Sequence, residues 1–202
     1  MKGLYLVTPD WDDTDQLLAV SERAIQGGAA LLQYRHKTAS DALRHEQAQA
    51  LLALCRKMNL PLIINDHIAL CEAIDADGIH VGGTDASVAD VRARVGAGKI
   101  VGASCYGDLQ LARDAATAGA SYVAFGGFYP SRVKKYAVTT SPDIIATALA
   151  ELSVPICVIG GMTPENSQVL IDRGAHMVAA ISSVYSAEDS HVAASKFAHM
   201  FR

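Results

Sequence analysis

Residues 62–85, with the sequence LIINDHIALCEAIDADGIHVGGTD, decide the fold because they contain one complete strand–helix–strand unit. Leu62–Ile64 is a continuous apolar run, which is typical of a strand buried on both faces. Residues 67–74 follow with helical spacing, and an Asp-Gly turn leads into a second apolar run at Gly78–Val81. The stretch therefore predicts two parallel strands joined by a helix.

Each of these two strands is followed by an aspartate. Asp66 comes just after the first strand and Asp85 just after the second. The carboxyl ends of parallel strands share one edge of a sheet, so the two carboxylates can converge there. Such a pair suits a hard cation such as Mg²⁺, which keeps several waters and contacts phosphate oxygens. In the alternative interpretation, Asp66 and Asp85 only cap the helices that follow them.

The same alternation continues along the chain. Eight short apolar runs predict strands at Leu4–Val7, Ala30–Gln33, Leu62–Ile64, Gly78–Val81, Ile100–Ala103, Tyr122–Phe125, Ile156–Ile159 and Met177–Ile181. Helical patterns lie between and after them at Asp12–Gln26, Ser40–Met58, His67–Ile74, Ser87–Val95, Asp108–Ala118, Pro142–Leu152, Pro164–Arg173 and His191–Phe201. Eight such units favour a closed (β/α)8 TIM barrel. A doubly wound open sheet is the alternative, but no GxGxxG motif follows the first strand.

Composition narrows the class of protein. The chain has 202 residues, half of them hydrophobic and 19% charged, so we expect one folded domain over residues 1–202 rather than a disordered chain. No apolar run is long enough for a membrane span and no leader is evident, so we expect a cytoplasmic protein. With a net charge of −4 and no basic block, nucleic acid is not an expected partner. The four cysteines are isolated in apolar segments, which predicts reduced thiols in the core. A homo-oligomer remains open.

The end of the second predicted strand carries a row of polar side chains. Gln33, Arg35 and Lys37 point the same way along an extended chain and offer an amide, a guanidinium and an ammonium group. This combination fits a polyanion, which Arg binds as a planar fork and Lys as a point charge. The alternative is a solvated basic strand end. Gln33 directly follows an apolar run, so we expect its side chain to face the barrel interior.

Three later loops add candidates for anion binding. Ser104 follows the fifth strand and either donates to a phosphate or simply turns the chain. The loop at residues 126–141 combines glycines with Ser131 and Lys134, which resembles a phosphate clamp, although a solvated basic loop is the alternative. Gly161 after strand seven, and Ile181 and Ser182 after strand eight, lie where this fold commonly binds phosphate with backbone N–H groups.

The residues thus predict two anion sites on one rim, the first beside a metal. This arrangement suits an enzyme that joins, or transfers a group between, two phosphorylated small molecules with Mg²⁺. His80 is a further candidate as a proton carrier.

The motifs, taken in order, resemble thiamine phosphate synthase. They are QYRHK at 33–37, IINDH at 63–67, ADGIHVGGTD at 76–85, GASC at 102–105, FGGFYPSRVKK at 125–135, VIGGMTPEN at 158–166 and AAISS at 179–183. The resemblance covers essentially the whole chain. It implies a TIM barrel that joins hydroxymethylpyrimidine pyrophosphate to thiazole phosphate and releases pyrophosphate.

The resemblance also implies roles for individual residues. The pyrimidine pyrophosphate would be held by Gln33, Arg35, Lys37, Asn65, Ser104 and Lys134. Asp66 and Asp85 would be the Mg²⁺ ligands. The thiazole phosphate would be held by Ser131, Val133, Gly161, Ile181 and Ser182. In the implied mechanism, the metal with Arg35, Lys37 and Lys134 stabilises the departing pyrophosphate, and the thiazole nitrogen captures the resulting pyrimidine methyl cation.

The sequence departs from the family pattern in the loop after the sixth strand. The family usually has Thr-x-Thr-Lys, whereas this chain has Ser131-Arg132-Val133-Lys134, and Val133 has no hydroxyl to donate. Two other functions therefore stay open. One is a thiazole tautomerase, a related subgroup that shares the barrel without needing the metal. The other is a non-catalytic barrel that binds a thiamine-related phosphate.

Overall fold

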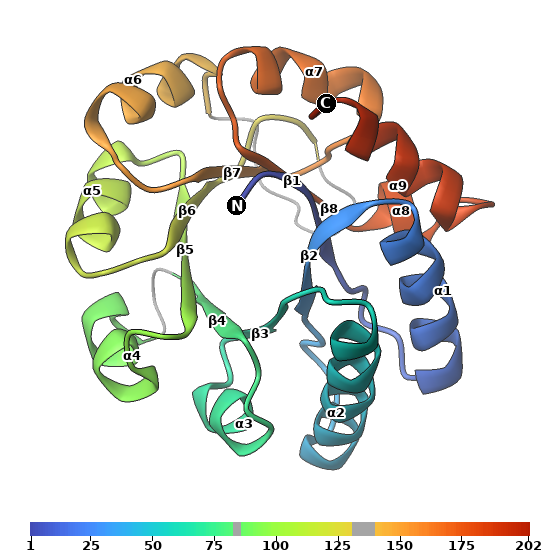
Figure 1. The fold of residues 1–202 in the computed structure, drawn as a ribbon. Coiled ribbons are helices and arrows are strands. Elements are labelled where there is room, and N and C mark those ends of the chain that lie inside the picture. The colour runs from blue at the N-terminus through green and yellow to red at the C-terminus, as the bar shows by residue number, and fades with distance from the viewer. Residues whose placement is uncertain (83–85, 131–139) are drawn as a thin grey trace.

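Eight parallel strands close into a barrel in the residues that the computed structural model describes, which are 1–82, 86–130 and 140–202. Each strand pairs with the next along the chain, and the last pairs with the first, so the ring has no free edge (Figure 1). The strands are β1 (Gly3–Val7), β2 (Ala29–Tyr34), β3 (Leu62–Asn65), β4 (Gly78–Val81), β5 (Ile100–Tyr106), β6 (Tyr122–Phe125), β7 (Ile156–Ile159) and β8 (Met177–Ala180).

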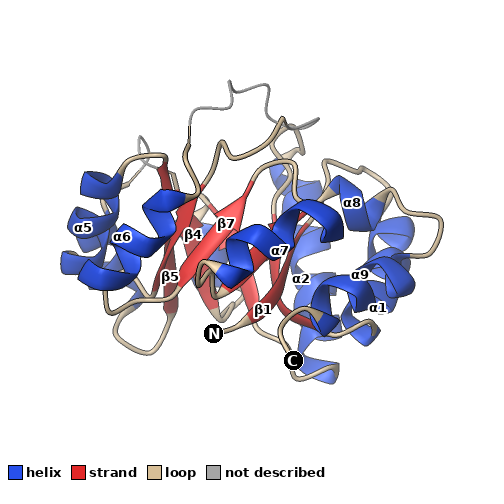
Figure 2. Ribbon diagram, turned by 90° about the horizontal axis from the view of Figure 1, so that it is seen from above, coloured by secondary structure: helices blue, strands red, loops and turns tan. Residues whose placement is uncertain are grey.

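Helices surround the barrel on the outside (Figure 1). They are α1 (Thr14–Gln26), α2 (Asp41–Lys57), α3 (Ile68–Ala73), α4 (Val88–Val95), α5 (Leu109–Thr117), α6 (Asp143–Glu151), α7 (Pro164–Asp172), α8 (Ser182–Tyr185) and α9 (Ser190–His199). Seen from the side, both chain ends lie at the same end of the barrel (Figure 2). The predicted TIM barrel is therefore confirmed, and no described helix is long and apolar enough to cross a membrane.

The helix boundaries follow the polar caps in the sequence. The side chain of Asp13 accepts the N–H of Gln16, so α1 begins at Thr14, two residues later than the periodicity suggested. Asp108 caps α5, because its side chain accepts two backbone N–H groups. Thr163 forms a capping box with Asn166 at the start of α7. The short helix α8 was not predicted, since four residues are too few to show a helical period.

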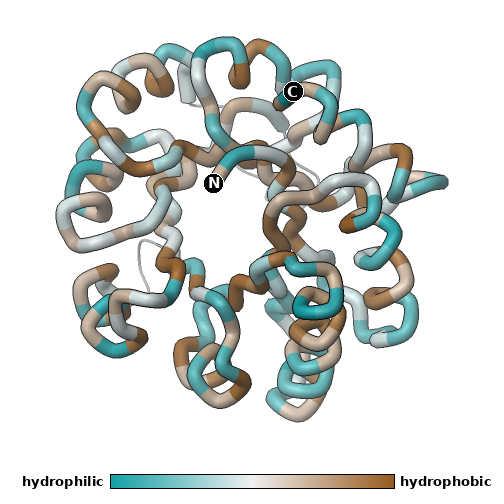
Figure 3. The backbone as a smooth tube through the Cα atoms, in the orientation of Figure 1, coloured by the Kyte–Doolittle hydropathy of each residue, from teal (hydrophilic) through white to brown (hydrophobic). Residues whose placement is uncertain are grey.

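Alternate strand residues pack into two separate apolar layers. The interior layer includes Tyr5, Leu31, Ile63 and Tyr122, while their strand neighbours, such as Leu4, pack outward against the helices. Figure 3 shows the matching pattern in the outer helices, whose tubes alternate between hydrophobic and hydrophilic residues. All four cysteines are buried and free, which confirms their expected place in the core.

Candidate active site

The carboxyl end of β3 carries a compact cluster of charged and amide groups. Lys37 Nζ lies 2.9 Å from Asp66 Oδ2, and Asn65 Nδ2 donates to the same oxygen at 2.6 Å. Asp66 has a left-handed backbone conformation with φ of 60°, and its N–H donates to the carbonyl of His80 on the next strand. Non-glycine residues adopt this conformation at some cost, and such strain is concentrated at functional sites. Three of the predicted site residues are thus in direct contact.

Asp66 does not act as a helix cap. The N-cap of α3 is His67, which makes no side-chain capping bond, and Asp66 instead faces Lys37 and Asn65. Burial alone would raise the pKa of Asp66. The hydrogen bond and charge of Lys37, together with the hydrogen bond of Asn65, outweigh burial and hold the pKa below its ordinary value of 3.8. The carboxylate is therefore ionised near neutral pH, as metal binding requires.

The cations of β2 are held in place by the loop that follows β1. Asp10 accepts hydrogen bonds from Arg35 Nη1 at 3.1 Å and from the Lys37 N–H at 2.9 Å. Thr8 Oγ1 accepts the Arg35 N–H and donates to the Arg35 carbonyl, so it fixes the peptide groups on both sides of Arg35. The guanidinium side chain of Arg35 is only 11% exposed. Its carboxylate partner, Asp10, is more exposed, at 34%. The guanidinium group is therefore held in a fixed position by a carboxylate that lies nearer the surface.

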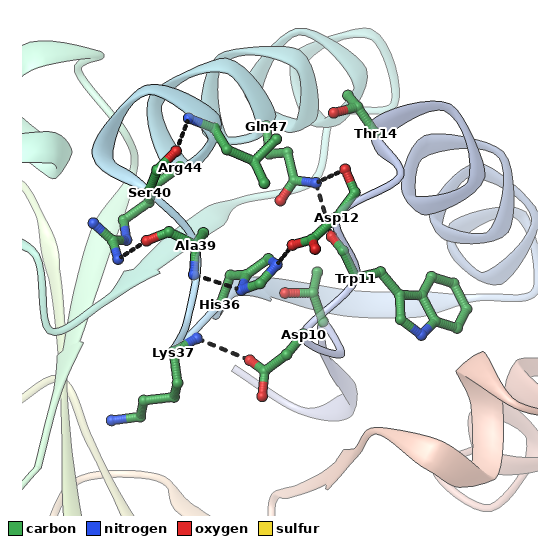
Figure 4. Close-up of polar contacts among 12 residues, drawn as sticks. Asp10, Trp11, Asp12, Thr14, His36, Lys37, Ala39, Ser40, Arg44 and Gln47 are labelled. Atoms are coloured by element: carbon green, nitrogen blue, oxygen red, sulfur yellow. Dashed lines mark hydrogen bonds and ion pairs between the residues drawn. The ribbon is translucent and has the colours of Figure 1, made fainter.

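A buried histidine completes this brace (Figure 4). His36 Nδ1 accepts the N–H of Ala39, and its Nε2 lies 3.0 Å from Asp12 Oδ1. Because Nδ1 is an acceptor, the ring proton is on Nε2 and is donated to Asp12. Gln47 on α2 donates to the carbonyls of Trp11 and Asp12 and so fastens the same loop from the other side.

Sequence reasoning missed the role of Thr8, Asp10 and Asp12. A signal was present, because three acidic residues follow the first strand directly, at Asp10, Asp12 and Asp13. In a barrel, this position lies on the same rim as the cations after the second strand. The carboxylates of one loop were therefore available to pair with the cations of the next.

Gln33 lies on β2 and Ser104 on β5, with β3 and β4 between them in the barrel wall. Gln33 is 4% exposed and its Nε2 donates to Tyr5 at 2.7 Å, which confirms that its side chain faces the interior. Ser104 Oγ lies 2.8 Å from His80 Nε2. The hydrogen-bond partners of Gln33 and Ser104 are therefore the interior residues Tyr5 and His80, and not Lys37 or Asp66.

At the ends of β7 and β8, the predicted site residues offer backbone N–H groups instead of charged side chains. Gly161 has φ of 65°, and a Cβ atom there would lie 2.2 Å from the carbonyl oxygen of Pro130. Ile181 packs against the interior layer and is the N-cap of α8, which begins at Ser182. The Val184 N–H donates to the Ile181 carbonyl, which leaves the N–H groups of Ser182 and Ser183 without a partner within the helix. Among the described residues, the buried Ser183 Oγ also has no hydrogen-bond partner.

Four predicted site residues lie outside the described residues: Asp85, Ser131, Val133 and Lys134. Their roles stay predictions. Within the described ranges, no group of three His, Cys, Asp or Glu side chains is placed to hold a metal ion. Asp66 is the predicted metal ligand that the structure does describe.

The fold and the site define a class of protein. The C-terminal rim of this (β/α)8 barrel holds an ionised aspartate, two cations in ion pairs, and a turn at Gly161 that only glycine fits. Such a rim is typical of enzymes that act on phosphorylated small molecules. Comparison with known proteins identifies the family within this class. The family model described as thiamine monophosphate synthase matches residues 4–184, and the chain belongs to this family.

Individual relatives agree with the family. The thiamine-phosphate synthase of Janthinobacterium sp. (strain Marseille) is 65% identical, over 100% of this chain and 97% of the relative. That of Thiobacillus denitrificans is 45% identical, over 98% of this chain and 94% of the relative. The solved thiamine phosphate pyrophosphorylase of Pyrococcus furiosus has a TM-score of 0.85 at 25% identity, with 98% of this chain and 95% of that chain covered. The predicted activity, a transferase of thiamine biosynthesis that makes thiamine phosphate, is therefore confirmed.

Proposed function

We propose that this rim condenses 4-amino-2-methyl-5-hydroxymethylpyrimidine pyrophosphate with 4-methyl-5-(2-phosphoethyl)thiazole, or its carboxylate, to give thiamine monophosphate and pyrophosphate. Gln33, Asn65 and Ser104 hold the pyrimidine side of the first substrate. Arg35, Lys37 and Lys134 hold its pyrophosphate. The enzyme is cytoplasmic, residues 1–202 form its catalytic domain, and its partners are these small molecules.

The reaction needs charge stabilisation more than a nucleophilic side chain. The bond between the pyrimidine methylene carbon and the pyrophosphate oxygen breaks, and its electron pair leaves with pyrophosphate. The thiazole nitrogen then donates its lone pair to the methylene carbon, which gives the thiazolium product. Arg35 and Lys37 face the developing negative charge, and their positions are fixed before substrate binds because Asp10 and Asp66 already hold them.

Mg²⁺ is the proposed cofactor, with Asp66 and Asp85 as its protein ligands. Asp66 fits this role because its carboxylate is ionised, is only 21% exposed and already accepts a cation, the ammonium group of Lys37. When bound, the metal would neutralise part of the pyrophosphate charge and so make it a better leaving group. Asn65 and Lys37 orient the Asp66 carboxylate from two sides.

The thiazole phosphate is assigned to the opposite part of the rim. Gly161, Ile181 and Ser182 would hold the phosphate through backbone N–H groups, and Ser131 and Val133 would contact the same substrate from the loop after β6. The buried Ser183 Oγ, without a partner among the described residues, supports an anion at this end. A single phosphate needs fewer cations than a pyrophosphate, which agrees with the backbone character of this end.

The observation that carries the proposal is the contact of Lys37 and Asn65 with Asp66 beside a braced Arg35. The test is pyrophosphate release by the purified protein with both substrates, first with Mg²⁺ and then with EDTA. We expect release only when the metal and both substrates are present. Release without metal would overturn the role of Asp66. Isomerisation of a thiazole carboxylate phosphate without pyrophosphate release would indicate the tautomerase, and binding with neither reaction would indicate the non-catalytic barrel.

A further inference from the structure

A continuous chain of hydrogen bonds crosses the interior of the barrel. Gln33 Nε2 donates to the Tyr5 hydroxyl at 2.7 Å, and Tyr5 lies 2.7 Å from the hydroxyl of Tyr122. The Tyr122 hydroxyl lies 2.9 Å from His80 Nδ1, and His80 Nε2 lies 2.8 Å from Ser104 Oγ. The five residues come from β2, β1, β6, β4 and β5, in that order. The two ends of the chain are the residues proposed to contact the pyrimidine.

The three middle residues lie in an apolar environment. Tyr5 is 1% exposed, Tyr122 is 0% and His80 is 7%. The two tyrosine rings pack edge to face, and the ring of His80 stacks on Tyr122. Burial raises the pKa of both tyrosines, so each hydroxyl keeps its proton. A buried hydroxyl without a partner is costly, so each proton in this chain needs an acceptor.

The barrel makes room for this chain at Gly102. A Cβ atom at this position of β5 would lie 2.2 Å from the Tyr122 hydroxyl oxygen and 2.6 Å from His80 Nδ1. Contacts below 3.0 Å are essentially never seen for a real Cβ atom. Gly102 therefore leaves the space in which Tyr122 meets His80, and this supports the chain independently of its hydrogen-bond distances.

The protons of the chain can be ordered in one direction. The Gln33 amide is a donor at Nε2, so the Tyr5 oxygen accepts and its own proton goes to Tyr122. Tyr122 then donates to His80 Nδ1, which places the ring proton on Nε2, and His80 donates to Ser104. In the reverse order, the Tyr5 proton would have no acceptor among the described residues. The forward order leaves the Ser104 proton available to a ligand.

We propose that Tyr5, Tyr122 and His80 are positioning residues, which set Gln33 to accept with its amide oxygen and Ser104 to donate with its hydroxyl. A ligand that matches both ends is a heteroaromatic ring with an exocyclic amino group and an unprotonated ring nitrogen. The inference rests on the proposed function, which places such an aminopyrimidine between these residues. It adds that three buried residues of the barrel interior determine how well that ring binds.

The first test removes one hydroxyl from the middle of the chain. Tyr122→Phe keeps the ring that stacks on His80 but removes the hydroxyl's bonds to both Tyr5 and His80. We expect the KM for pyrimidine pyrophosphate to rise about tenfold, which corresponds to the loss of about one hydrogen bond to the ring. The KM for thiazole phosphate should not change. If both KM values stay at the wild-type level, the proposal is overturned. Tyr5→Phe gives the same test at the neighbouring hydroxyl if the first variant does not fold.

A matched control is available outside the barrel. Tyr185 is also a buried tyrosine, and its hydroxyl lies 2.9 Å from Ser21 Oγ, between α8 and α1. Tyr185→Phe should lower thermal stability, as Tyr122→Phe does, while leaving the KM for pyrimidine pyrophosphate unchanged. An equal change of KM in the two variants would show a general loss of stability instead of positioning, and would overturn the proposal.

A double-mutant cycle separates positioning from a structural role. His80 bonds to both Tyr122 and Ser104, so a positioning chain predicts that Tyr122→Phe has a smaller effect in a Ser104→Ala background. Independent, multiplying effects would contradict the proposal. If instead Gln33→Ala and Ser104→Ala each keep the wild-type KM, the proposed pyrimidine site itself is wrong.

The proton order can be measured without substrate. Nitrogen-15 NMR of histidine-labelled protein, with the His80 signals assigned by comparison with His80→Gln, reports which ring nitrogen carries the proton. We expect a neutral His80 with its proton on Nε2. A proton on Nδ1, or on both nitrogens, would overturn the proposed direction. Because this measurement needs no activity, it distinguishes a failure of the positioning chain from a failure of the proposed function.

Discussion

The two ends of the rim use different chemistry. The ends of β2 and β3 carry Arg35, Lys37 and Asp66, whose charged groups are paired and held by neighbouring loops. The ends of β7 and β8 offer instead a left-handed glycine, Gly161, and the first N–H groups of a one-turn helix. Under the proposed function, this contrast lets one barrel match two anions of unequal charge, with side-chain charge for pyrophosphate and backbone donors for a monophosphate.

The largest effect is expected at the charged end. Asp66→Asn keeps a residue that tolerates the left-handed conformation but removes the carboxylate that would hold Mg²⁺. We expect kcat/KM to fall on the order of 10²–10³-fold, since a metal contributes several kcal/mol of charge stabilisation. Pyrophosphate release measured across a Mg²⁺ titration checks this, with circular dichroism as the control for folding. Wild-type turnover in this variant would remove Asp66 from the site.

A smaller effect is expected at the backbone end. Gly161→Ala places a Cβ atom 2.2 Å from the Pro130 carbonyl oxygen in addition to the strain of its φ. We expect the KM for thiazole phosphate to rise roughly 10–100-fold because the cradle shifts, while the KM for pyrimidine pyrophosphate is kept.

Gly96 is the matched control for this change. Its φ is 81°, and no atom lies within 4 Å of an added Cβ. Its ψ is 174°, a region that is essentially restricted to glycine, so Gly96→Ala should cost roughly 1–3 kcal/mol of stability from backbone strain and leave both KM values unchanged. Thermal melts and steady-state kinetics of the two variants measure the difference. A similar kinetic loss in both would contradict a binding role for Gly161.

The brace on Arg35 should have a moderate effect. Asp10→Ala frees the guanidinium and the Lys37 N–H, so the cations lose their orientation but keep their charge. Less negative charge near the site would favour an anion by at most about 1 kcal/mol, because Asp10 is partly exposed. We expect loss of orientation to prevail and kcat/KM to fall about tenfold. Asp189→Asn, which weakens the exposed pair with Arg23 far from the rim, should leave the kinetics unchanged.

The smallest effect concerns the pH dependence of stability. The pKa of Asp66 lies below 3.8 in the folded protein, so its ion pair with Lys37 contributes stability that is present above this value and lost as pH falls through the folded-state pKa. The Lys37 side chain is half exposed, so the contribution is at most about 1 kcal/mol. The difference in melting temperature between wild type and Lys37→Met should be constant above about pH 5 and shrink in stronger acid. A difference that grows in acid would contradict this sign.

Strand and helix order could be predicted from the sequence because local signals set them. Buried parallel strands are short apolar runs, and Asp108 and Thr163 cap their helices within the chain itself. The charged half of the site could be predicted for a similar reason, since Gln33, Arg35 and Lys37 stand two residues apart on one strand end. An amide, a guanidinium and an ammonium group indicate anion binding from residue type alone.

The rest depends on contacts between distant strands. Tyr5 and Tyr122 look like ordinary core residues in their strands, and only closure of the barrel brings their hydroxyls together. Asp10 pairs with a cation 25 residues later in the chain, a partner that no local pattern identifies. The backbone end is also hard to predict, because N–H groups are present at nearly every residue and only their geometry makes a site.

The most direct test of the division between the two ends is calorimetric binding of each ligand to three proteins. Pyrophosphate with Mg²⁺, and thiazole phosphate alone, would be titrated into wild type, Asp66→Asn and Gly161→Ala. We predict a crossed pattern, in which Asp66→Asn loses affinity for magnesium pyrophosphate only and Gly161→Ala loses affinity for thiazole phosphate only. Loss of both ligands to the same extent in both variants would contradict it.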